Sequence, residues 1–376
     1  MNHLILNNKT YHLPQLTVDV PDQAGLSDYE RRVLAFCREW LSGREAFVVQ
    51  TSGSTGRPKP ISLTRQQMMA SAAQTGRALG LQAGDRALVC LSADYIAGRM
   101  MLVRGFTLGL QLTIIDPSGN PLQMFSPQSN FDFTAMVPLQ LQNILTETPD
   151  KVALLDRMKG ILIGGAAVSL ALQAQLQQVR GPIYHTYGMT ETVSHIALRR
   201  LNGPQADQAF VPFPGVALGL DGRGCLTIRA AVTNQQTVVT NDLVQLQPDG
   251  SFVWLGRVDN VINSGGVKVQ VERVERALEQ FLLNRQRGRA DQADGAERRF
   301  FVGPLADPQW GQAVVAVIEG RPFEREAALA EAMRAELSGT LSRYELPKAV
   351  HFVAQFAETP TGKVDRQATL QRLRAG

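Results

Sequence analysis

Apolar residues recur along the chain at two spacings, and these spacings divide its first half into helices and strands. In residues 28–41 they recur every three or four positions, which is typical of an amphipathic helix. Further on, short apolar runs alternate with stretches of helical spacing. The runs lie at 47–50, 87–91, 112–115, 135–138, 160–163 and 183–184, and the helical stretches at 64–79, 95–108, 139–145 and 169–179. This alternation predicts an α/β fold with a mostly parallel sheet.

The pattern changes after Pro212. Short alternating segments predict a subdomain of antiparallel strands at residues 225–229, 237–240, 244–246 and 252–255. We interpret the following polar stretch, GRVDNVINSGG, as a linker and residues 285–299 as a charged loop. The sequence thus predicts a large domain over residues 1–258 and a small α+β domain over residues 259–376. The small domain is expected to have helices at 271–283 and 325–337 and strands at 314–318 and 349–353.

The composition is that of a globular protein. Of the 376 residues, 44% are apolar and 19% are charged, and the formal net charge of +4 comes from scattered Lys and Arg residues. Scattered charge argues against nucleic-acid binding and fits small anionic substrates. The start of the chain lacks a signal-peptide pattern, and no apolar stretch is long enough to span a bilayer. We therefore expect a soluble protein without membrane insertion.

The three cysteines give no sign of a metal or disulfide site. Cys37, Cys90 and Cys225 lie far apart and lack C-x-x-C spacing. Each is expected to be a small buried hydrophobic residue. Their use favours a reducing, cytoplasmic location.

A run of small hydroxyl and glycine residues follows the apolar run at 47–50. In VVQTSGSTGRPKP, Arg57 and Lys59 come directly after Thr51, Ser52, Gly53, Ser54, Thr55 and Gly56. Glycines allow close backbone approach, and successive N–H and hydroxyl groups can surround a phosphate. The spacing matches neither the Walker loop nor G-x-G-x-x-G. From these residues alone, a phosphate-binding loop and a flexible Ser/Gly loop both stay open.

Four further motifs follow in order: YGMTET at 187–192, TNDL at 240–243, GRVDNVINSGGVKV at 256–269 and TPTGKVDR at 359–366. With the first, they resemble the acyl-adenylate-forming superfamily, which includes acyl-CoA synthetases, adenylation domains of peptide synthetases and luciferases. The resemblance covers nearly the whole chain from Phe47. It implies a large N-terminal domain, a small mobile C-terminal domain, and use of ATP, Mg²⁺ and CoA. A carboxylate would react with ATP to give acyl-AMP and pyrophosphate, and a thiol would then displace AMP.

For the first motif, the resemblance implies a mobile loop that holds the β- and γ-phosphates of ATP. Residues 51–56 would supply N–H and hydroxyl donors, and Lys59 would stabilise the leaving pyrophosphate. Pro60 stands where the family usually has glycine, which stiffens the loop exit without removing a phosphate donor.

In YGMTET, the resemblance implies that Tyr187 stacks on adenine beside Gly188, Thr190 contacts the α-phosphate and Glu191 binds Mg²⁺. Oxygen ligands suit this cation. Without its neighbours, Tyr187 would be an ordinary core aromatic and Glu191 a solvated acid. Residues Gly164, Gly165 and Ala166 resemble the family's adenine-binding turn, although a Gly-Gly pair after a strand is often only a turn.

Asp242 in TNDL matches the aspartate that accepts hydrogen bonds from the ribose hydroxyls, and Arg257 matches its partner. Asn241 stands where the family commonly has glycine. Asp259 matches the hinge residue about which the small domain rotates. By default, such an aspartate would be a turn residue and such an arginine a solvated charge.

Lys363 matches the lysine that reaches from the small domain into the adenylation site, where a cation would bridge two negatively charged reactants. Gly266 and Lys268 in SGGVKV resemble the face that lines the thiol tunnel of CoA ligases. This favours CoA as the acceptor, while a carrier protein stays an alternative.

The short region before Phe47, with SADYIAGRMMLVRG at 92–105 and YGMTETVSHIALR at 187–199, most resembles the o-succinylbenzoate-CoA ligases of menaquinone synthesis. Under this interpretation Tyr95 would be the aromatic gate beside the acyl pocket. Arg99 or His195 could face the second carboxylate of the substrate. The helix with Tyr95, Ile96, Met100 and Met101 could equally pack its own core, an interpretation that we favour for the two methionines.

Two alternatives stay open. One is another aryl- or acyl-CoA ligase or an enzyme that loads a carrier protein, and the other is a non-catalytic nucleotide-binding relative. Retention of Glu191, Asp242, Arg257 and Lys363 counts against the second. The expected partners are a small carboxylate, ATP and CoA, without nucleic acid. The oligomeric state stays open, with a homodimer as one alternative.

Overall fold

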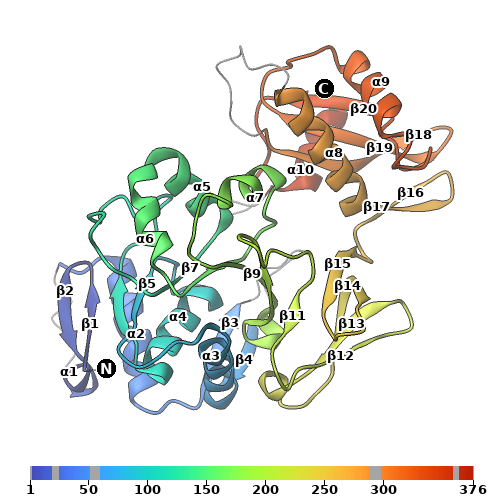
Figure 1. The fold of residues 1–376 in the computed structure, drawn as a ribbon. Helices are drawn as coiled ribbons and strands as arrows, with labels where there is room; N and C mark the ends of the chain where they lie inside the picture. Colours follow the sequence, from blue (N-terminus) through green and yellow to red (C-terminus); the bar gives the residue numbers. More distant parts are fainter. Residues whose placement is uncertain (1, 19–24, 51–59, 288–297, 359–363, 376) are drawn as a thin grey trace. The chain divides into compact units, whose positions relative to one another are not determined.

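This computed structural model describes residues 2–18, 25–50, 60–287, 298–358 and 364–375 (Figure 1). The chain divides into two compact units. The first comprises Met1–Gly219, Thr227–Thr240 and Leu246–Val253, and the second Leu220–Leu226, Asn241–Gln245 and Trp254–Gly376. The units interleave between residues 219 and 254, so the division into domains after residue 258 stays a prediction.

A nine-stranded sheet forms the centre of the first unit, in the order β11-β10-β9-β8-β7-β5-β6-β1-β2. Its strands are β1 (His3–Leu6), β2 (Lys9–His12), β5 (Arg86–Val89), β6 (Gln111–Ile114), β7 (Phe133–Met136), β8 (Gly160–Ile163), β9 (Ile183–Gly188), β10 (His195–Arg200) and β11 (Val211–Pro212). The strands from β9 to β1 in this order run parallel, and β2, β10 and β11 add antiparallel pairs at the two edges. The predicted α/β class with a mostly parallel sheet is therefore confirmed.

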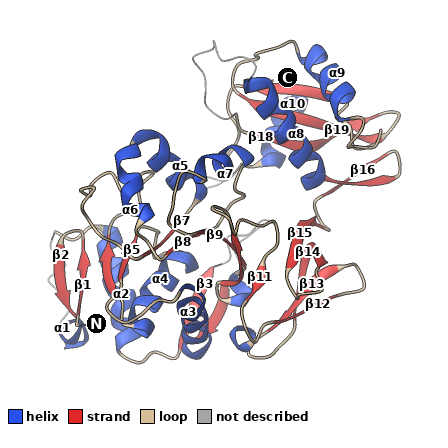
Figure 2. Ribbon diagram, in the orientation of Figure 1, coloured by secondary structure: helices blue, strands red, loops and turns tan. Residues whose placement is uncertain are grey.

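Helices cover this sheet because its central strands are apolar on both faces. All residues of β7 (FTAM) and β8 (GILI) are buried, as expected for parallel strands that lie between helix layers. The helices are α1 (Leu13–Val18), α2 (Asp28–Leu41), α3 (Arg65–Leu79), α4 (Ile96–Leu108), α5 (Pro138–Glu147), α6 (Val152–Asp156) and α7 (Leu170–Leu176). In Figure 2, α3 and α4 lie on one side of β7 and β8, and α5, α6 and α7 lie on the other.

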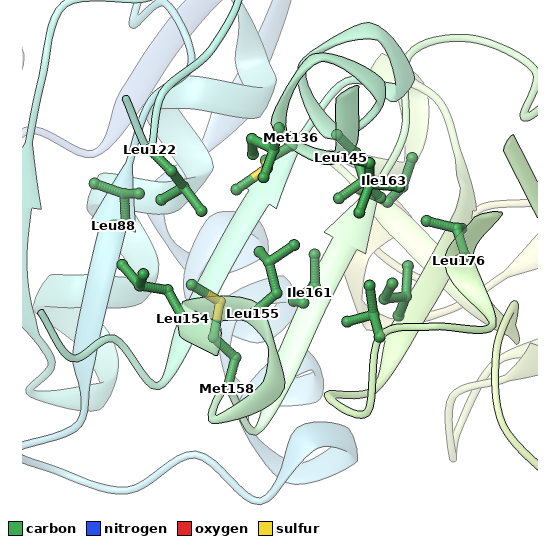
Figure 3. Packing of buried hydrophobic residues seen from close by; sticks show 14 of the residues in the cluster. Leu88, Leu122, Met136, Leu145, Leu154, Leu155, Met158, Ile161, Ile163 and Leu176 are labelled. Atoms are coloured by element: carbon green, nitrogen blue, oxygen red, sulfur yellow. The ribbon is translucent and has the colours of Figure 1, made fainter. Parts of the chain in front are cut away.

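Figure 3 shows the core under α5, α6 and α7, where labelled side chains from helices and strands point toward one another. Leu154 and Leu155 of α6 meet Ile161 and Ile163 of β8, and all four are fully buried. Burial of each such side chain contributes about 1.5–3 kcal/mol relative to exposure. This packing fixes the position of β8, whose carboxyl end carries a predicted site segment.

The first predicted strand pairs differently from what the alternation suggests. β3 (Ala46–Gln50) forms a separate two-stranded antiparallel sheet with β4 (Pro60–Thr64) and is not part of the parallel sheet. The large sheet is instead extended by β1 and β2, which the sequence analysis did not predict. The hydroxyl-rich residues 51–59 join β3 to β4 and lie outside the described residues.

A four-stranded sheet in the order β12-β13-β14-β15 corresponds to the predicted β subdomain. Its strands are β12 (Ala217–Leu220), β13 (Cys225–Arg229), β14 (Val238–Leu246) and β15 (Phe252–Arg257). The two runs predicted at 237–240 and 244–246 form the single strand β14.

The second unit contains a five-stranded sheet in the order β17-β16-β19-β18, with β20 also paired to β19. Its elements are β16 (Val261–Ser264), β17 (Val267–Gln270), α8 (Val271–Arg287), β18 (Phe300–Asp307), β19 (Gly311–Glu319), α9 (Glu326–Leu337), β20 (Ala349–Val353) and α10 (Arg366–Ala375). The predicted helices and strands at 271–283, 314–318, 325–337 and 349–353 are confirmed.

The interpretation of GRVDNVINSGG as a plain linker is wrong in its second half. Residues of β16 pair with β17 in a hairpin, from Val261 opposite Gln270 to Ser264 opposite Val267. The hairpin turn is possible because Gly265 and Gly266 have φ of +58° and +79°. The predicted charged loop at 285–299 begins later than expected, because α8 continues to Arg287.

The three cysteines are buried and free, as predicted. Burial raises the pKa of the Cys37 and Cys90 thiols to about 12, and it also raises that of Cys225. Among the helices in the described ranges, none combines the length and the apolar character needed to cross a bilayer.

Candidate functional site

Two predicted site segments leave neighbouring parallel strands at the same edge of the large sheet. β8 ends at Ile163, which lies opposite His185 of β9. The turn Gly164-Gly165-Ala166 follows β8, and Tyr187-Gly188 ends β9. Ligands of α/β proteins commonly bind at the carboxyl ends of parallel strands. The fold thus brings the predicted adenine-binding turn and YGMTET to one edge.

The turn after β8 requires glycine at two positions for two reasons. A Cβ on Gly164 would lie 2.4 Å from Oγ1 of Thr186, whose hydroxyl donates to the Ile163 carbonyl at 3.2 Å. Gly165 has φ of +83°, a backbone conformation that L-residues rarely adopt. The Gly164 N–H donates to the Met136 carbonyl of β7 at 3.2 Å. The backbone of this turn is therefore fixed against two neighbouring strands.

His185 lies beneath the same turn in neutral form. Burial and the nearby Arg199 guanidinium lower the pKa of His185 to about 4, and a hydrogen bond with the Ala166 backbone opposes this shift. Arg199 Nη2 lies 3.3 Å from Nδ1 of His185. Because a guanidinium only donates, Nδ1 accepts, and the proton of the ring stays on Nε2.

The ring of Tyr187 packs against two other aromatic rings. Its ring lies 5.6 Å from the ring of Phe210 and 5.0 Å from that of Phe252, edge to face with the latter. Only 9% of Tyr187 is exposed. This packing orients the ring at the end of β9, and its predicted contact with adenine stays a prediction.

The segment from Gly188 to His195 folds back tightly on itself. A Cβ on Gly188 would lie 2.2 Å from the Ser194 carbonyl oxygen, so only glycine allows the backbones to approach this closely. Thr192 Oγ1 donates to the Ser194 carbonyl at 2.8 Å, and the Ser194 N–H donates to the Thr192 carbonyl at 2.7 Å. Val193 is forced to φ of +66°, which is strained for a β-branched residue.

This turn includes a 3₁₀ helix at Thr190–Thr192 and presents Glu191 to solvent. No hydrogen bond or ion pair joins the Glu191 carboxylate to another side chain among the residues that the structure describes. Within those residues, no group of three His, Cys, Asp or Glu side chains could hold a metal. A single free carboxylate fits Mg²⁺, which is usually held by one or two carboxylates together with phosphate oxygens and water.

His195 is enclosed under this turn by a network that also contains Arg104 of α4. Thr75 Oγ1 lies 3.1 Å from Nε2 of His195, and Ser194 Oγ lies 3.3 Å from its Nδ1. Burial, and secondarily Arg104, lowers the pKa of His195 well below its usual value. His195 is 5% exposed and neutral, so its proposed contact with a substrate carboxylate would need a change in the surrounding packing.

Arg99 and Tyr95, the other predicted substrate residues, lie at the start of α4. Arg99 donates to the carbonyls of Ala93 and Val48, both at 2.9 Å, and its guanidinium carbon lies 5.7 Å from the centre of the Phe36 ring. It is therefore engaged in connecting α4 to β3. Tyr95 is 47% exposed at the N-cap of α4.

In the second unit, the predicted ribose residues lie together. Asp242 of β14 is 7% exposed and accepts a hydrogen bond from Trp254 Nε1 at 3.2 Å. Arg257 Nη1 lies 3.8 Å from Asp242 Oδ1. The two residues that the sequence assigned to one ligand are thus neighbours in the fold.

Arg257 is held more closely by the predicted hinge residue, Asp259. Nε and Nη2 of Arg257 donate to the two carboxylate oxygens of Asp259 at 2.9 and 2.8 Å. This fork lowers the pKa of Asp259 and raises that of Arg257. Asn241 Nδ2 also donates to Asp259 at 3.0 Å, and Arg223 Nη1 donates to Asn241 Oδ1 at 3.0 Å. Asn241, which departs from the family's usual glycine, thus braces the predicted hinge.

A family model described as AMP-binding enzyme matches residues 15–221, more than half of the chain. The chain belongs to the AMP-binding enzyme family.

Two relatives match the sequence of this AMP-binding enzyme along most of its length. It is 27% identical over 361 residues to a 2-succinylbenzoate–CoA ligase of Salmonella typhimurium, covering 91% of this chain and 72% of that protein. It is 30% identical over 359 residues to a protein of Mycobacterium tuberculosis named "Probable 2-succinylbenzoate–CoA ligase", covering 89% and 86%.

A solved structure shares the fold. The acyl-CoA synthetase (AMP-forming)/AMP-acid ligase II-like protein from Dyadobacter fermentans is 46% identical, with a TM-score of 0.60 and coverage of 92% of this chain and 95% of that one. The two chains match over most of the length of each.

Several predicted residues of the AMP-binding enzyme remain to be placed. Gly266 lies in the turn between β16 and β17, and Lys268 lies in β17 opposite Asn263; both are exposed. The predictions for Thr51, Ser52, Gly53, Ser54, Thr55, Gly56, Lys59 and Lys363 fall outside the described residues.

Sequence reasoning missed Arg104. The signal was present, because Arg104 lies three and four positions after Met101 and Met100, on the face of α4 that was predicted to be core. A charged residue in an apolar stripe indicates either a misplaced helix face or a buried functional group.

Proposed function

We propose that the chain is an AMP-forming acid–thiol ligase that converts 2-succinylbenzoate to its CoA thioester. In the first step the carboxylate attacks the α-phosphorus of ATP, giving acyl-AMP and pyrophosphate. In the second step the CoA thiol attacks the acyl carbon and releases AMP. The choice of 2-succinylbenzoate as the substrate rests on the sequence identity to relatives named as 2-succinylbenzoate–CoA ligases, one of them as a probable one, over about nine-tenths of the chain.

The carboxyl edge of the large sheet supports the first step. The fixed turn after β8 would receive the adenine beside Tyr187, and the Thr190–Thr192 turn would bring a hydroxyl and the Glu191 carboxylate to the phosphates. Mg²⁺ held by Glu191 would supply charge neutralisation on the phosphate oxygens. Asp242 would accept from the ribose hydroxyls, and Lys363 would bridge the reacting carboxylate and phosphate.

A second candidate, an AMP-forming ligase for a different carboxylic acid, rests on the Dyadobacter neighbour. That protein is described only as an acyl-CoA synthetase (AMP-forming)/AMP-acid ligase II-like protein, yet it is 46% identical to this chain where the two match. The arginine best placed by sequence to meet a second carboxylate, Arg99, is bonded to backbone carbonyls. Both candidates use the same adenylation chemistry and differ only in the acid.

A coupled assay of AMP release with ATP, Mg²⁺ and CoA separates the candidates. It compares 2-succinylbenzoate with benzoate, a medium-chain fatty acid and a set of amino acids. Turnover with 2-succinylbenzoate alone supports the proposal and a role in cytoplasmic menaquinone synthesis. Turnover with another acid alone supports the second candidate. AMP release that depends on a carrier protein in place of CoA would contradict the proposal that CoA is the acyl acceptor.

A further inference from the structure

The segment that carries Lys363 has both of its ends fixed within the second unit. Glu358 and Val364 pair in an antiparallel β-bridge, and the Asp365 N–H donates to the Ala357 carbonyl at 2.7 Å. We call this short ladder the stem. The five residues between Glu358 and Val364 lie outside the described residues, but Lys363 directly precedes a backbone whose hydrogen bonds are described.

The stem continues into α10, and the first turn of that helix fixes it further. The Asp365 carboxylate caps the helix, because its Oδ1 accepts from the Ala368 N–H at 2.9 Å. Thr369 Oγ1 donates to the Asp365 carbonyl at 2.8 Å and accepts from the Ala357 N–H at 3.0 Å. One threonine of α10 thus joins the two sides of the stem.

An ion pair attaches the start of α10 to α8. Arg366, the first residue of α10, donates from Nη2 to Oε2 of Glu275 at 3.2 Å, and its Nη1 lies 2.8 Å from Oε1. Oε1 of Glu275 also accepts from the Val302 N–H of β18 at 2.8 Å. The guanidinium carbon lies 5.7 Å from the centre of the Phe301 ring. Glu275 of α8 thus holds both β18 and α10, the latter only three positions after Lys363.

The surroundings of Glu275 make this contact depend on charge. Only 19% of its side chain is exposed, and burial raises the pKa of its carboxyl, whereas the Arg366 guanidinium opposes this shift. Loss of one member of such a pair is costly because the other stays in place without its opposite charge. On the other side of the stem, Glu358 accepts from Arg299 at 2.6 Å, but there the acid is 38% exposed. Of the two acids that hold the stem, Glu275 is the one more shielded from water.

We propose that Glu275 is a positioning residue for the adenylation half-reaction: it holds Arg366 and, with it, the end of the segment that carries Lys363. This inference rests on the proposed function, in which Lys363 bridges the reacting carboxylate and phosphate. A displaced cation stabilises the transition state less, and a shift of about 1 Å can lower a rate by about a hundredfold. The second half-reaction, in which Lys363 is predicted to have no part, supplies an internal comparison.

The two half-reactions of the full chain, measured separately in Glu275→Gln, test this inference. Glutamine keeps the size of the side chain and an acceptor for the Val302 N–H, but it loses the charge that holds Arg366. We expect ATP–pyrophosphate exchange at saturating ATP and acid to fall by about tenfold, while thioester formation from supplied acyl-AMP and CoA stays within about twofold of the wild type. Glu331→Gln is the matched control, because it makes the same change at an exposed position of α9 and should alter neither rate.

A double-variant cycle shows whether Glu275 acts through Arg366. Arg366→Met should itself slow ATP–pyrophosphate exchange, and Glu275→Gln should add no further loss in that background, because both changes break one contact. Hydrogen–deuterium exchange gives a readout that does not depend on catalysis. The Asp365 N–H of the stem should exchange faster in Glu275→Gln and Arg366→Met than in the wild type, and Glu331→Gln should match the wild type.

The inference is overturned if folded Glu275→Gln keeps the wild-type rate of ATP–pyrophosphate exchange, or if it slows both half-reactions equally. Additive losses in the double variant, or unchanged hydrogen–deuterium exchange at Asp365, would also overturn it, since Glu275 would then act by another route. If Glu275→Gln does not fold, Arg366→Lys carries the same test, because lysine lacks the planar pair of donors that faces both carboxylate oxygens. Failure of the proposed function looks different, since the wild type itself would then show no ATP–pyrophosphate exchange with any acid.

Discussion

Replacing Gly164 by alanine should destabilise the protein through one identifiable contact. The new Cβ would lie 2.4 Å from Thr186 Oγ1, far closer than nonbonded atoms approach, whereas the Thr186 Cβ lies at an ordinary 3.8 Å. Thr186 can relieve the overlap only by rotating its hydroxyl away from the Ile163 carbonyl, to which it now donates at 3.2 Å. The damage therefore depends on one oxygen atom.

The expected cost is about 2 kcal/mol. Loss of this half-buried hydrogen bond contributes about 1 kcal/mol, and residual overpacking contributes about 1 kcal/mol more. In a Thr186→Ala background the offending oxygen is absent, so Gly164→Ala should then cost no more than about 0.5 kcal/mol. The coupling energy between the two positions should thus be about 1.5 kcal/mol.

Urea unfolding of the wild type, both single variants and the double variant, followed by far-UV circular dichroism, measures this coupling. Gly165→Ala is the matched control, because its Cβ would have no neighbour closer than 3.6 Å but its φ is +83°. It should cost about 1–2 kcal/mol through backbone strain, and Thr186→Ala should not rescue it. The reasoning is refuted if Gly164→Ala is as costly in the Thr186→Ala background as in the wild type.

Three further outcomes are expected. Glu191→Gln should lower the rate of ATP–pyrophosphate exchange by about 10²-fold or more at limiting Mg²⁺ and leave the unfolding midpoint unchanged, because the carboxylate is exposed; an unchanged rate would remove Glu191 from the metal site. Lys363→Ala should abolish exchange but spare thioester formation from supplied acyl-AMP, and equal loss of both half-reactions would contradict rotation of the small domain. His185 has a folded pKa of about 4, below its unfolded value of about 6.5, so the unfolded chain binds the proton first. Its contribution to stability is present above pH 6.5 and is lost as the pH falls toward 4. The unfolding midpoint of His185→Gln should therefore depend less on pH in this window than that of the wild type.

The sequence predicted the parallel part of the fold well because helices and buried strands differ in spacing. It could not predict which short strands pair. The run at 47–50 is as apolar as the others, yet β3 pairs with β4 across the residues of the first motif. β1 joins the large sheet beside β6, more than a hundred positions away along the chain. Periodicity describes the two faces of a strand and carries no information about its hydrogen-bonded neighbour.

Part of the candidate site was also within reach of the sequence. The Gly164–Ala166 turn and YGMTET meet because the strands that precede them are parallel neighbours. Two features were out of reach because they depend on pairwise geometry: the fork between Arg257 and Asp259, and the choice of hydrogen-bond partners around Arg104. The spacing of Arg104 from Met100 and Met101 indicates the core face of the helix, but only the packing shows which side chains the guanidinium meets there.

The buried cysteines have a consequence for an enzyme of this kind. An acyl-adenylate is an acylating agent, and the second half-reaction hands its acyl group to whichever thiolate reaches it. Only the thiolate is nucleophilic, and at neutral pH a thiol with a pKa of about 12, as in Cys37 and Cys90, is almost wholly protonated. Cys225 is likewise buried. The fold thus protects its own sulfur atoms from self-acylation and leaves the incoming thiol without an internal competitor.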